Sequence, residues 1–237
     1  MQKQNFLEFI YINRFEILEQ TIEHLGLTLI SLGIALLISI PLGIFITRCK
    51  KIREIIFGII GVIQTIPSIA LLGFLIPLVG IGPTPAIIAL FLYALLPIVR
   101  NTTIGIEEVD PSVKEAARGL GMSDLQMLFM VELPLATPVI FAGIRTAAVL
   151  NVAIATICAY IGAGGLGKFI FRGIALNNTD MILAGAIPAA LLAITLDFLL
   201  GILQKKIKKI IRPLTIVLSF LILILTMSFF YSNLNPQ

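Results

Sequence analysis

The chain has 237 residues, of which 58% are hydrophobic and only 13% are charged, and its mean hydropathy is +1.06. Soluble domains carry about 25% charged residues, so this composition excludes an ordinary soluble protein. The apolar runs are continuous rather than alternating, which favours membrane helices over a β-barrel. The net charge of +4 reflects Lys and Arg in short loops between such helices, so it does not indicate a nucleic-acid partner. We therefore expect an all-α integral membrane protein embedded in a lipid bilayer.

Six stretches are long and apolar enough to cross a membrane, which takes about 20 residues each: 25–47, 55–78, 84–100, 133–161, 181–204 and 213–231. The second and third are separated by "VGIGPTP", whose glycines and prolines predict a turn. Residues 1–24 are then an extracytoplasmic N-terminal segment, 25–205 a transmembrane domain, and 206–237 a basic loop with an additional C-terminal membrane helix. Residues 1–24 lack the pattern of a cleavable signal peptide, so we expect the first span to be an uncleaved anchor.

Lys and Arg are distributed unevenly between the two sides of these spans. Twelve follow the first, third and fifth spans, whereas four lie on the opposite side. Basic residues collect in cytoplasmic loops, so the twelve predict the cytoplasmic side and place both termini outside. Cys49 and Cys158 then lie at opposite faces of the membrane, which argues against a disulfide.

The stretch "AYIGAGGLGKFIF" (159–171) contains glycine patterns that resemble nucleotide-binding motifs. Gly162, Gly164 and Gly167 satisfy G-x-G-x-x-G, and with Lys168 they satisfy most of the phosphate-binding pattern, although an apolar residue stands where Ser or Thr should coordinate magnesium. The stretch follows a membrane helix rather than a strand, and it lies at the outer side, away from cytoplasmic nucleotides. We interpret it as a tight turn that allows close helix packing. A narrower alternative is that the turn forms part of the external mouth of a pathway.

The longest cytoplasmic connection, 101–134, predicts two short helices joined at an elbow. Asp110 is a good N-cap and is followed by proline at the first helical position. The glycines at 119–121 should end this helix, and Ser123 with Gln126 should start the second as a capping box. From these residues alone, the loop is either a rigid projection into the cytoplasm or an amphipathic loop on the membrane surface.

The same loop carries a longer motif: E-A-A, three residues, G, nine residues, V-E-L-P. Its motif positions are Glu115, Ala116, Ala117, Gly121, Val131, Leu133 and Pro134. This resembles the EAA motif of ABC importer permeases, which ends in I-x-L-P, and only the isoleucine is replaced, by valine. The resemblance implies that the loop couples to a separate cytoplasmic ATPase subunit. It also implies that Glu115 is a polar anchor, that the alanines allow close approach, and that Gly121 sets the elbow.

The resemblance extends over about residues 20–205, where stretches such as "QTIPSIALLGFLIPLVGIG" and "RTAAVLNVAIATICAYIGAGGLG" are similar to the osmoprotectant branch of these permeases. It implies a type I ABC importer permease-like bundle in a bacterial cell membrane, with a five-span core to which the sixth helix is an addition. The implied cargo is a quaternary ammonium compound such as glycine betaine, carnitine or choline. The implied partners are cytoplasmic ABC ATPase subunits, an extracytoplasmic substrate-binding protein, and a second permease copy or a paralogue.

Four polar residues within the predicted spans are candidates for a solute pathway. Gln64 lies near Pro67, which should kink the second span and shape either a gate or ordinary packing. Arg145 would cost about 2.5–3.5 kcal/mol at mid-bilayer, so it serves either a structural role near the cytoplasmic end of its span or the pathway. Asn151 and Tyr160 could line the route, although asparagine also bonds between membrane helices.

No catalytic chemistry is indicated elsewhere. His24 has no clustered ligands, and the sequence contains neither a nucleophile–base–acid set nor an ATP-hydrolysing motif, so we expect a transport subunit without a cofactor or metal. Asp197 should be anchored near the cytoplasmic surface. One alternative is an ABC permease for an amino acid such as methionine, which the EAA motif does not distinguish. Another is an ATP-independent channel or secondary carrier, which predicts coupled ion sites where the spans hold almost no charge.

Overall fold

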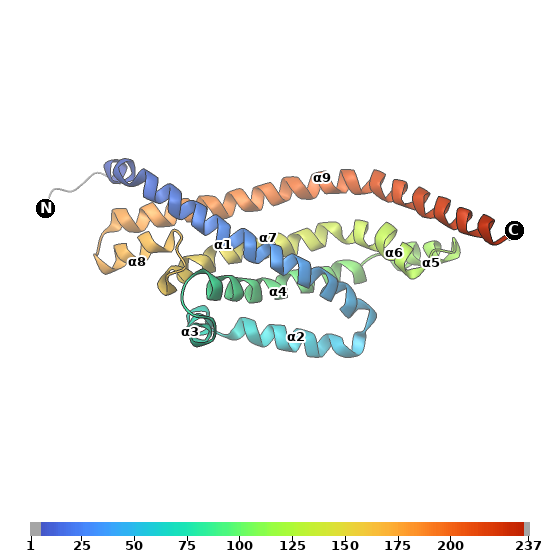
Figure 1. Cartoon of the computed structure of the whole chain (residues 1–237), viewed down its shortest axis with the longest axis horizontal. Helices are drawn as coiled ribbons and strands as arrows, with labels where there is room; N and C mark the ends of the chain where they lie inside the picture. Colours follow the sequence, from blue (N-terminus) through green and yellow to red (C-terminus); the bar gives the residue numbers. More distant parts are fainter. Residues whose placement is uncertain (1–5, 235–237) are drawn as a thin grey trace.

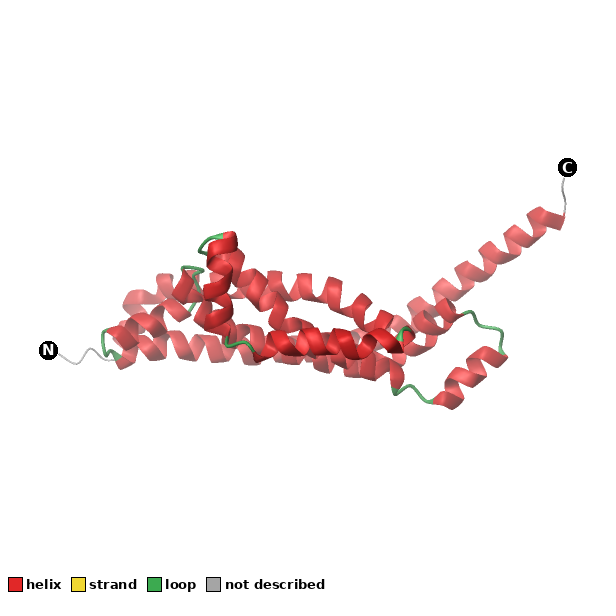
Figure 2. Cartoon of the chain, turned by 90° about the horizontal axis from the view of Figure 1, so that it is seen from below, coloured by secondary structure: helices red, strands yellow, loops and turns green. Residues whose placement is uncertain are grey.

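The computed structural model describes the backbone of residues 6–234 and the side chains of residues 6–206 except Lys50. Within that part, the chain consists of helices and short loops and contains no strand (Figures 1 and 2). The helices are α1 (Phe6–Arg48), α2 (Lys50–Thr65), α3 (Ser68–Val79), α4 (Pro83–Glu107), α5 (Pro111–Gly119), α6 (Asp124–Met127), the π-helix η1 (Leu128–Glu132), α7 (Leu133–Cys158), the 3₁₀-helix η2 (Ala159–Ile161), α8 (Gly167–Ala175) and α9 (Thr179–Leu234).

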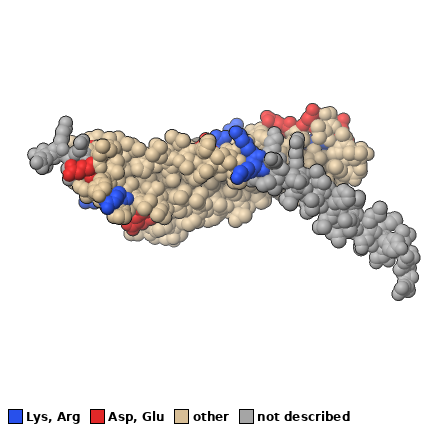
Figure 3. All heavy atoms as spheres, turned by 90° about the horizontal axis from the view of Figure 1, so that it is seen from above, with Lys and Arg blue, Asp and Glu red and all other residues tan. Residues whose placement is uncertain are grey.

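The long helices lie side by side as an elongated bundle (Figure 1). Helix α4 packs against α1 and α7, and α7 also packs against α9, so α4 and α7 are central. Small residues such as Ala35, Ala94 and Ala147 are fully buried where α1, α4 and α7 meet. Large apolar side chains such as Leu37 and Phe74 point outward, and a broad uncharged belt separates two charged ends (Figure 3). This is the surface that a bilayer requires.

Five of the six predicted spans have counterparts among the described residues, but not every boundary agrees. Four helices among the described residues are long and apolar enough to cross a membrane, and the bent α2–α3 pair makes a fifth. The first span was predicted to begin at residue 25, whereas α1 begins at Phe6 and contains 43 residues, roughly 64 Å of helix against about 30 Å of hydrocarbon. No glycine or proline interrupts residues 6–24, so the helix continues outward, where Phe9 packs with Phe169 and Met181.

The second predicted span is broken rather than kinked. Helices α2 and α3 are bent by 98° on either side of Ile66 and Pro67. Proline has no N–H to continue the helix, and it pushes the preceding residue into an extended conformation, which Ile66 adopts with φ −70° and ψ 127°.

The basic loop predicted at the start of 206–237 is also wrong, because α9 continues without a turn to Leu234. Lys and Arg are good helix formers, and no glycine or proline lies between Gly201 and Pro213, so charge alone does not end the helix. The side chains of the predicted sixth span, 213–231, lie outside the described residues.

Helices α4 and α7 cross closely at Gly143. A Cβ atom built there would lie 2.5 Å from the backbone oxygen of Pro97 and 2.6 Å from Cβ of Asn101. Membrane helices approach in this way where one of them carries a small residue, so Gly143 sets the spacing of the two central helices.

We predict that Gly143→Ala lowers the free energy of unfolding by about 1–3 kcal/mol, because the added methyl group must push two helix backbones apart. The measurement is the thermal unfolding midpoint of the purified protein in detergent. Gly33→Ala is the matched control, since nothing lies within 4 Å of a Cβ at this position. A Gly143→Ala protein as stable as the wild type would contradict this account of the crossing.

Candidate functional site

The loop predicted to be cytoplasmic forms α5 and α6 at one end of the bundle, and the glycine-rich turn before α8 lies toward the other (Figure 1). Both predicted helix starts are confirmed. Asp110 accepts hydrogen bonds from the Ser112 hydroxyl (2.7 Å) and the Ser112 backbone N–H (2.8 Å), which hold the pKa of the Asp110 carboxyl below its usual range. Ser123 and Gln126 form the predicted capping box. Between the helices, Gly121 adopts a φ of +78°, a conformation that glycine allows without strain.

The motif residues divide into exposed and buried groups. Glu115 and Ala116 are exposed on α5, whereas Ala117 is only 4% exposed and packs inside the loop, so the two alanines do not present one common surface. Val131, Leu133 and Pro134 are half-buried where η1 joins α7. The surface available to a partner is therefore built around Glu115 and Ala116.

Large apolar side chains extend this surface. Leu120 is 80% exposed, Leu125 is 68% exposed and Phe129 is 52% exposed, and they surround the elbow and the second helix. Exposed apolar side chains that gather at one place mark an interaction site. Leu128, which precedes Phe129 in the chain, is buried instead.

The segment before α7 is a π-helix, a rare form that is frequently found at functional sites. It occupies Leu128–Glu132, and its widened turn is closed by a hydrogen bond from the Leu133 N–H to the Leu128 oxygen. Pro134 follows at once; its ring would clash with the carbonyl group four residues earlier in a regular helix. The wider turn relieves that clash and directs Glu132 toward the inside of the loop.

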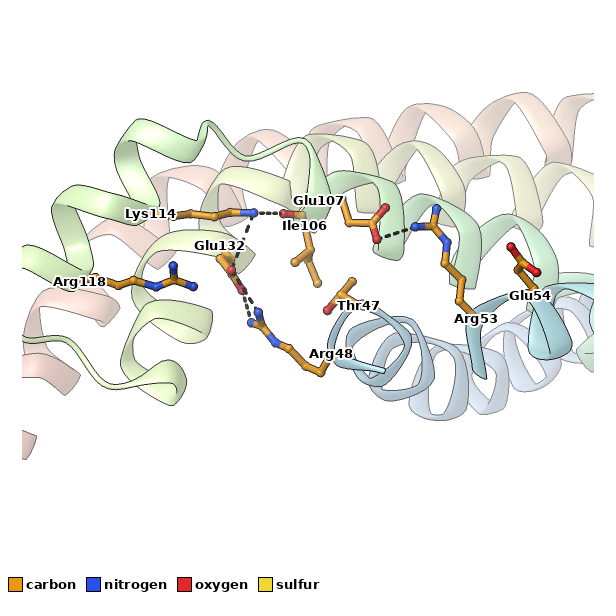
Figure 4. A pocket seen from close by; sticks show the side chains of 9 residues that line it. All are labelled: Thr47, Arg48, Arg53, Glu54, Ile106, Glu107, Lys114, Arg118 and Glu132. Carbon is orange, nitrogen blue, oxygen red and sulfur yellow. Dashed lines mark hydrogen bonds and ion pairs between the residues drawn. The ribbon is translucent and has the colours of Figure 1, made fainter. Parts of the chain in front are cut away.

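Glu132 is a buried acid at the centre of a cluster of charges (Figure 4). Its side chain is 1% exposed and pairs with Arg48, whose second nitrogen lies 3.4 Å from the carboxylate. Nζ of Lys114 lies 3.9 Å from the same carboxylate and donates a hydrogen bond of 2.9 Å to the backbone oxygen of Ile106. The Glu132 carboxylate, just before α7, thus contacts the end of α1 and α5, and Lys114 adds a contact with the last turn of α4.

A cavity of about 860 Å³ adjoins the cluster and is lined by Thr47, Arg48, Arg53, Glu54, Ile106, Glu107, Lys114, Arg118 and Glu132 (Figure 4). Arg53 pairs with Glu107 at 2.7 Å elsewhere in the lining of this cavity. Sequence reasoning missed Glu132, although one signal was available: it is the single acid within the apolar stretch "LFMVELPL". A buried acid of this kind requires a cation, because a charge left unpaired costs about 3–5 kcal/mol.

The four pathway candidates contact different elements, and the structure does not bring them together. Gln64 donates a hydrogen bond to the backbone oxygen of Tyr93 (2.9 Å) and so supports the α2–α3 bend. Tyr160 is 67% exposed and packs edge-to-face on Phe171, with ring centroids 5.0 Å apart.

The other two candidates make contacts between helices. Arg145 forms a two-pronged ion pair with Asp197 at 2.7 and 2.6 Å, which joins α7 to α9, so Asp197 is anchored by this arginine. Asn151 is fully buried and donates to the Ser31 hydroxyl at 3.1 Å, which joins α7 to α1. For both residues, contacts between helices were the alternative to lining a pathway, and the structure shows such contacts.

The glycine-rich stretch is a turn closed against α1, as interpreted from the sequence. Gly162, Gly164 and Gly165 all have positive φ angles. Glu23 accepts a hydrogen bond from the Gly165 backbone N–H at 3.1 Å and pairs with Lys168 at 3.4 Å. Among the described residues, no group of three or more His, Cys, Asp or Glu side chains is placed to hold a metal ion.

Comparison with known proteins agrees with the resemblance found in the loop. Residues 39–213 match the family described as "Binding-protein-dependent transport system inner membrane component". The chain is 44% identical to the choline transport system permease protein OpuBB of Bacillus subtilis, covering 86% of this chain and 94% of that protein. It is 47% identical to the carnitine transport permease protein OpuCB of Listeria monocytogenes, covering 84% and 91%. It is 48% identical to the osmoprotectant import permease protein OsmW of Salmonella typhimurium, covering 78% and 88%.

Solved structures share the fold. A chain of the MetNI methionine ABC transporter in an inward-facing conformation superposes with a TM-score of 0.69 at 24% identity, covering 84% of this chain and 97% of that chain. A chain of an amino acid ABC transporter gives the same TM-score at 22% identity, covering 86% and 100%. The predicted all-α, type I importer-like fold is confirmed. With the family match spanning most of the chain, the protein belongs to the inner membrane components of binding-protein-dependent transport systems.

Proposed function

We propose that this chain is the membrane-spanning permease subunit of an ATP-driven importer for osmoprotectants of the quaternary ammonium class, such as glycine betaine, carnitine and choline. The observation that carries the proposal is the 44–48% identity, over most of the chain, to permeases named for choline, carnitine and osmoprotectant transport. Identity of this extent covers both the membrane helices and the cytoplasmic loop.

The energy for transport comes from a separate cytoplasmic ATPase subunit. The exposed Glu115 and Ala116 and the apolar side chains of Leu120, Leu125 and Phe129 provide a surface of the mixed character typical of protein interfaces. ATP binding closes two ATPase subunits, draws together the loops of two permease copies, and converts the bundle between inward-open and outward-open states. The second copy is either identical to this chain or a paralogue.

Cargo is delivered by a substrate-binding protein on the outer side. Recognition of a quaternary ammonium group by aromatic faces resides in that protein. The uneven distribution of the basic residues supports an orientation with the loop in the cytoplasm and the start of α1 outside.

Reversing the charge of Glu115 should disrupt the contact with the ATPase. We expect Glu115→Lys to reduce co-purification of the ATPase subunit by about tenfold or more, because a polar anchor is replaced by a repelling charge. Glu16→Lys is the matched control. It makes the same change at an exposed position near the start of α1, far from the loop that carries Glu115. Equal recovery of the ATPase with both variants would argue against this contact.

The cargo class is tested by uptake of radiolabelled glycine betaine, carnitine and choline in cells that contain the neighbouring ATPase and binding-protein genes, with and without this gene. We expect gene-dependent uptake of at least one of the three, and its loss with Glu115→Lys. Uptake of methionine alone would retain the importer and replace the cargo. Uptake that persists with Glu115→Lys would favour an ATP-independent channel or carrier.

The orientation is tested by labelling single cysteines with a membrane-impermeant maleimide, in a protein that carries Cys49→Ser and Cys158→Ala. We expect Glu16→Cys to be labelled in intact spheroplasts and Ser112→Cys only after permeabilisation, because both positions are exposed but lie on opposite sides of the membrane. The reverse pattern would invert the proposed topology.

A further inference from the structure

We propose that Glu132 is a positioning residue that transmits movement of the cytoplasmic loop to the inner end of α1, through its ion pairs with Arg48 and Lys114. This inference rests on the proposed function, in which an ATPase moves the loop, and it assigns a part of the path by which that movement reaches the membrane helices. The cluster lies inside the permease, behind the surface proposed to contact the ATPase.

The attachment of α5 is the first observation. Of its nine residues, only Lys114 and Ala117 are not exposed. Apart from the chain connections at its two ends, α5 therefore transmits a displacement imposed from outside mainly through the packing of Ala117 and the charged contacts of Lys114. The Lys114 contacts are with Glu132 and with the backbone oxygen of Ile106, in the last turn of α4.

The position of Arg48 is the second observation. It is the last residue of α1, and α2 begins two residues later. A force on the Arg48 side chain therefore acts directly on the junction of these two helices. Arg48 is separated from Glu132 by 84 residues, yet it supplies the closer of the two cations that face the buried carboxylate. Movement of Glu132 relative to α1 must stretch or break this pair.

The physical nature of the link suits a moving joint. The attraction between charges falls only as the inverse of their separation, whereas packing contacts vanish within a fraction of an ångström. The adjoining cavity of about 860 Å³ leaves room for these long side chains to follow a displaced helix. A buried acid held by two flexible cations therefore keeps α5, α7 and α1 connected while the angles between them change.

The test measures solute uptake and ATP hydrolysis by the reconstituted complex of permease, ATPase and binding protein. We expect Glu132→Gln and Arg48→Gln to retain the ATPase subunit but to lower the solute imported per ATP hydrolysed by about tenfold. The double variant should import no less solute per ATP than the more impaired single variant, because both substitutions remove the same Arg48–Glu132 ion pair. Arg53→Gln is the matched control: it breaks the neighbouring pair with Glu107 (2.7 Å) and should leave the ratio unchanged.

A second measurement does not depend on transport. Amide hydrogen exchange of the purified permease should increase together in α5 and in the last turns of α1 for Glu132→Gln, and not for Arg53→Gln. If Glu132→Gln fails to fold, Arg48→Gln carries both measurements, because the Arg48 side chain is 41% exposed.

The link is overturned if both single variants keep the wild-type ratio and exchange pattern, or if their losses multiply in the double variant. Parallel loss of uptake and hydrolysis, together with a general loss of stability, would also overturn it in favour of a merely structural role. A wild-type permease that binds no ATPase would instead refute the proposed function, and the exchange measurement would still decide whether Glu132 ties α5 to α1.

Discussion

Inside a bilayer no water is available to form hydrogen bonds with the backbone. Wherever a membrane helix is broken, the freed N–H and C=O groups must therefore find partners within the protein. The breaks in this chain follow that constraint. At the α2–α3 bend, the Tyr93 hydroxyl donates to the backbone oxygen of Ile66, and Gln64 donates to the backbone oxygen of Tyr93. Before α4, the Gly82 backbone N–H donates to the oxygen of Ile161 at 2.9 Å. Irregular backbone therefore occurs where the central helices α4 and α7, or the turn at the end of α7, provide a partner.

Charges in and next to the spans obey the same rule. Ionisable groups in membrane segments pair with one another or face water. Arg145 and Asp197 lie 52 positions apart in the sequence, where each is a single charge within a predicted span. In the structure they form one two-pronged ion pair between α7 and α9. Glu132 is buried more completely and has two cations. The difference is informative: the first pair joins two helices, whereas the second joins the loop to several elements at once.

Features with local causes could be predicted from the sequence. The capped starts of α5 and α6, the Gly121 elbow and the glycine-rich turn depend on residues within a few positions of one another. The start of α1 was misplaced because apolar content marks the membrane and not the helix, and nothing in residues 6–24 ends a helix. The break at Pro67 was expected as a kink, because its 98° angle depends on bonds to Tyr93 on α4. The role of Glu132 was hidden for the same reason, since the partner Arg48 lies 84 residues away.

The two ends of the bundle also differ in whether contacts within the chain cover their loops. The glycine-rich turn is closed against α1, because Glu23 accepts a hydrogen bond from the Gly165 backbone N–H and pairs with Lys168. The loop that forms α5 and α6 is not closed in this way: Leu120, Leu125 and Phe129 are more than half exposed, and the loop lies at one end of the bundle (Figure 1). Outward apolar residues of α9 such as Ile194 have lipid as their partner, but these three do not. Their exposure is explained when the loop is one half of an interface, and the buried charges behind it then hold that half in place.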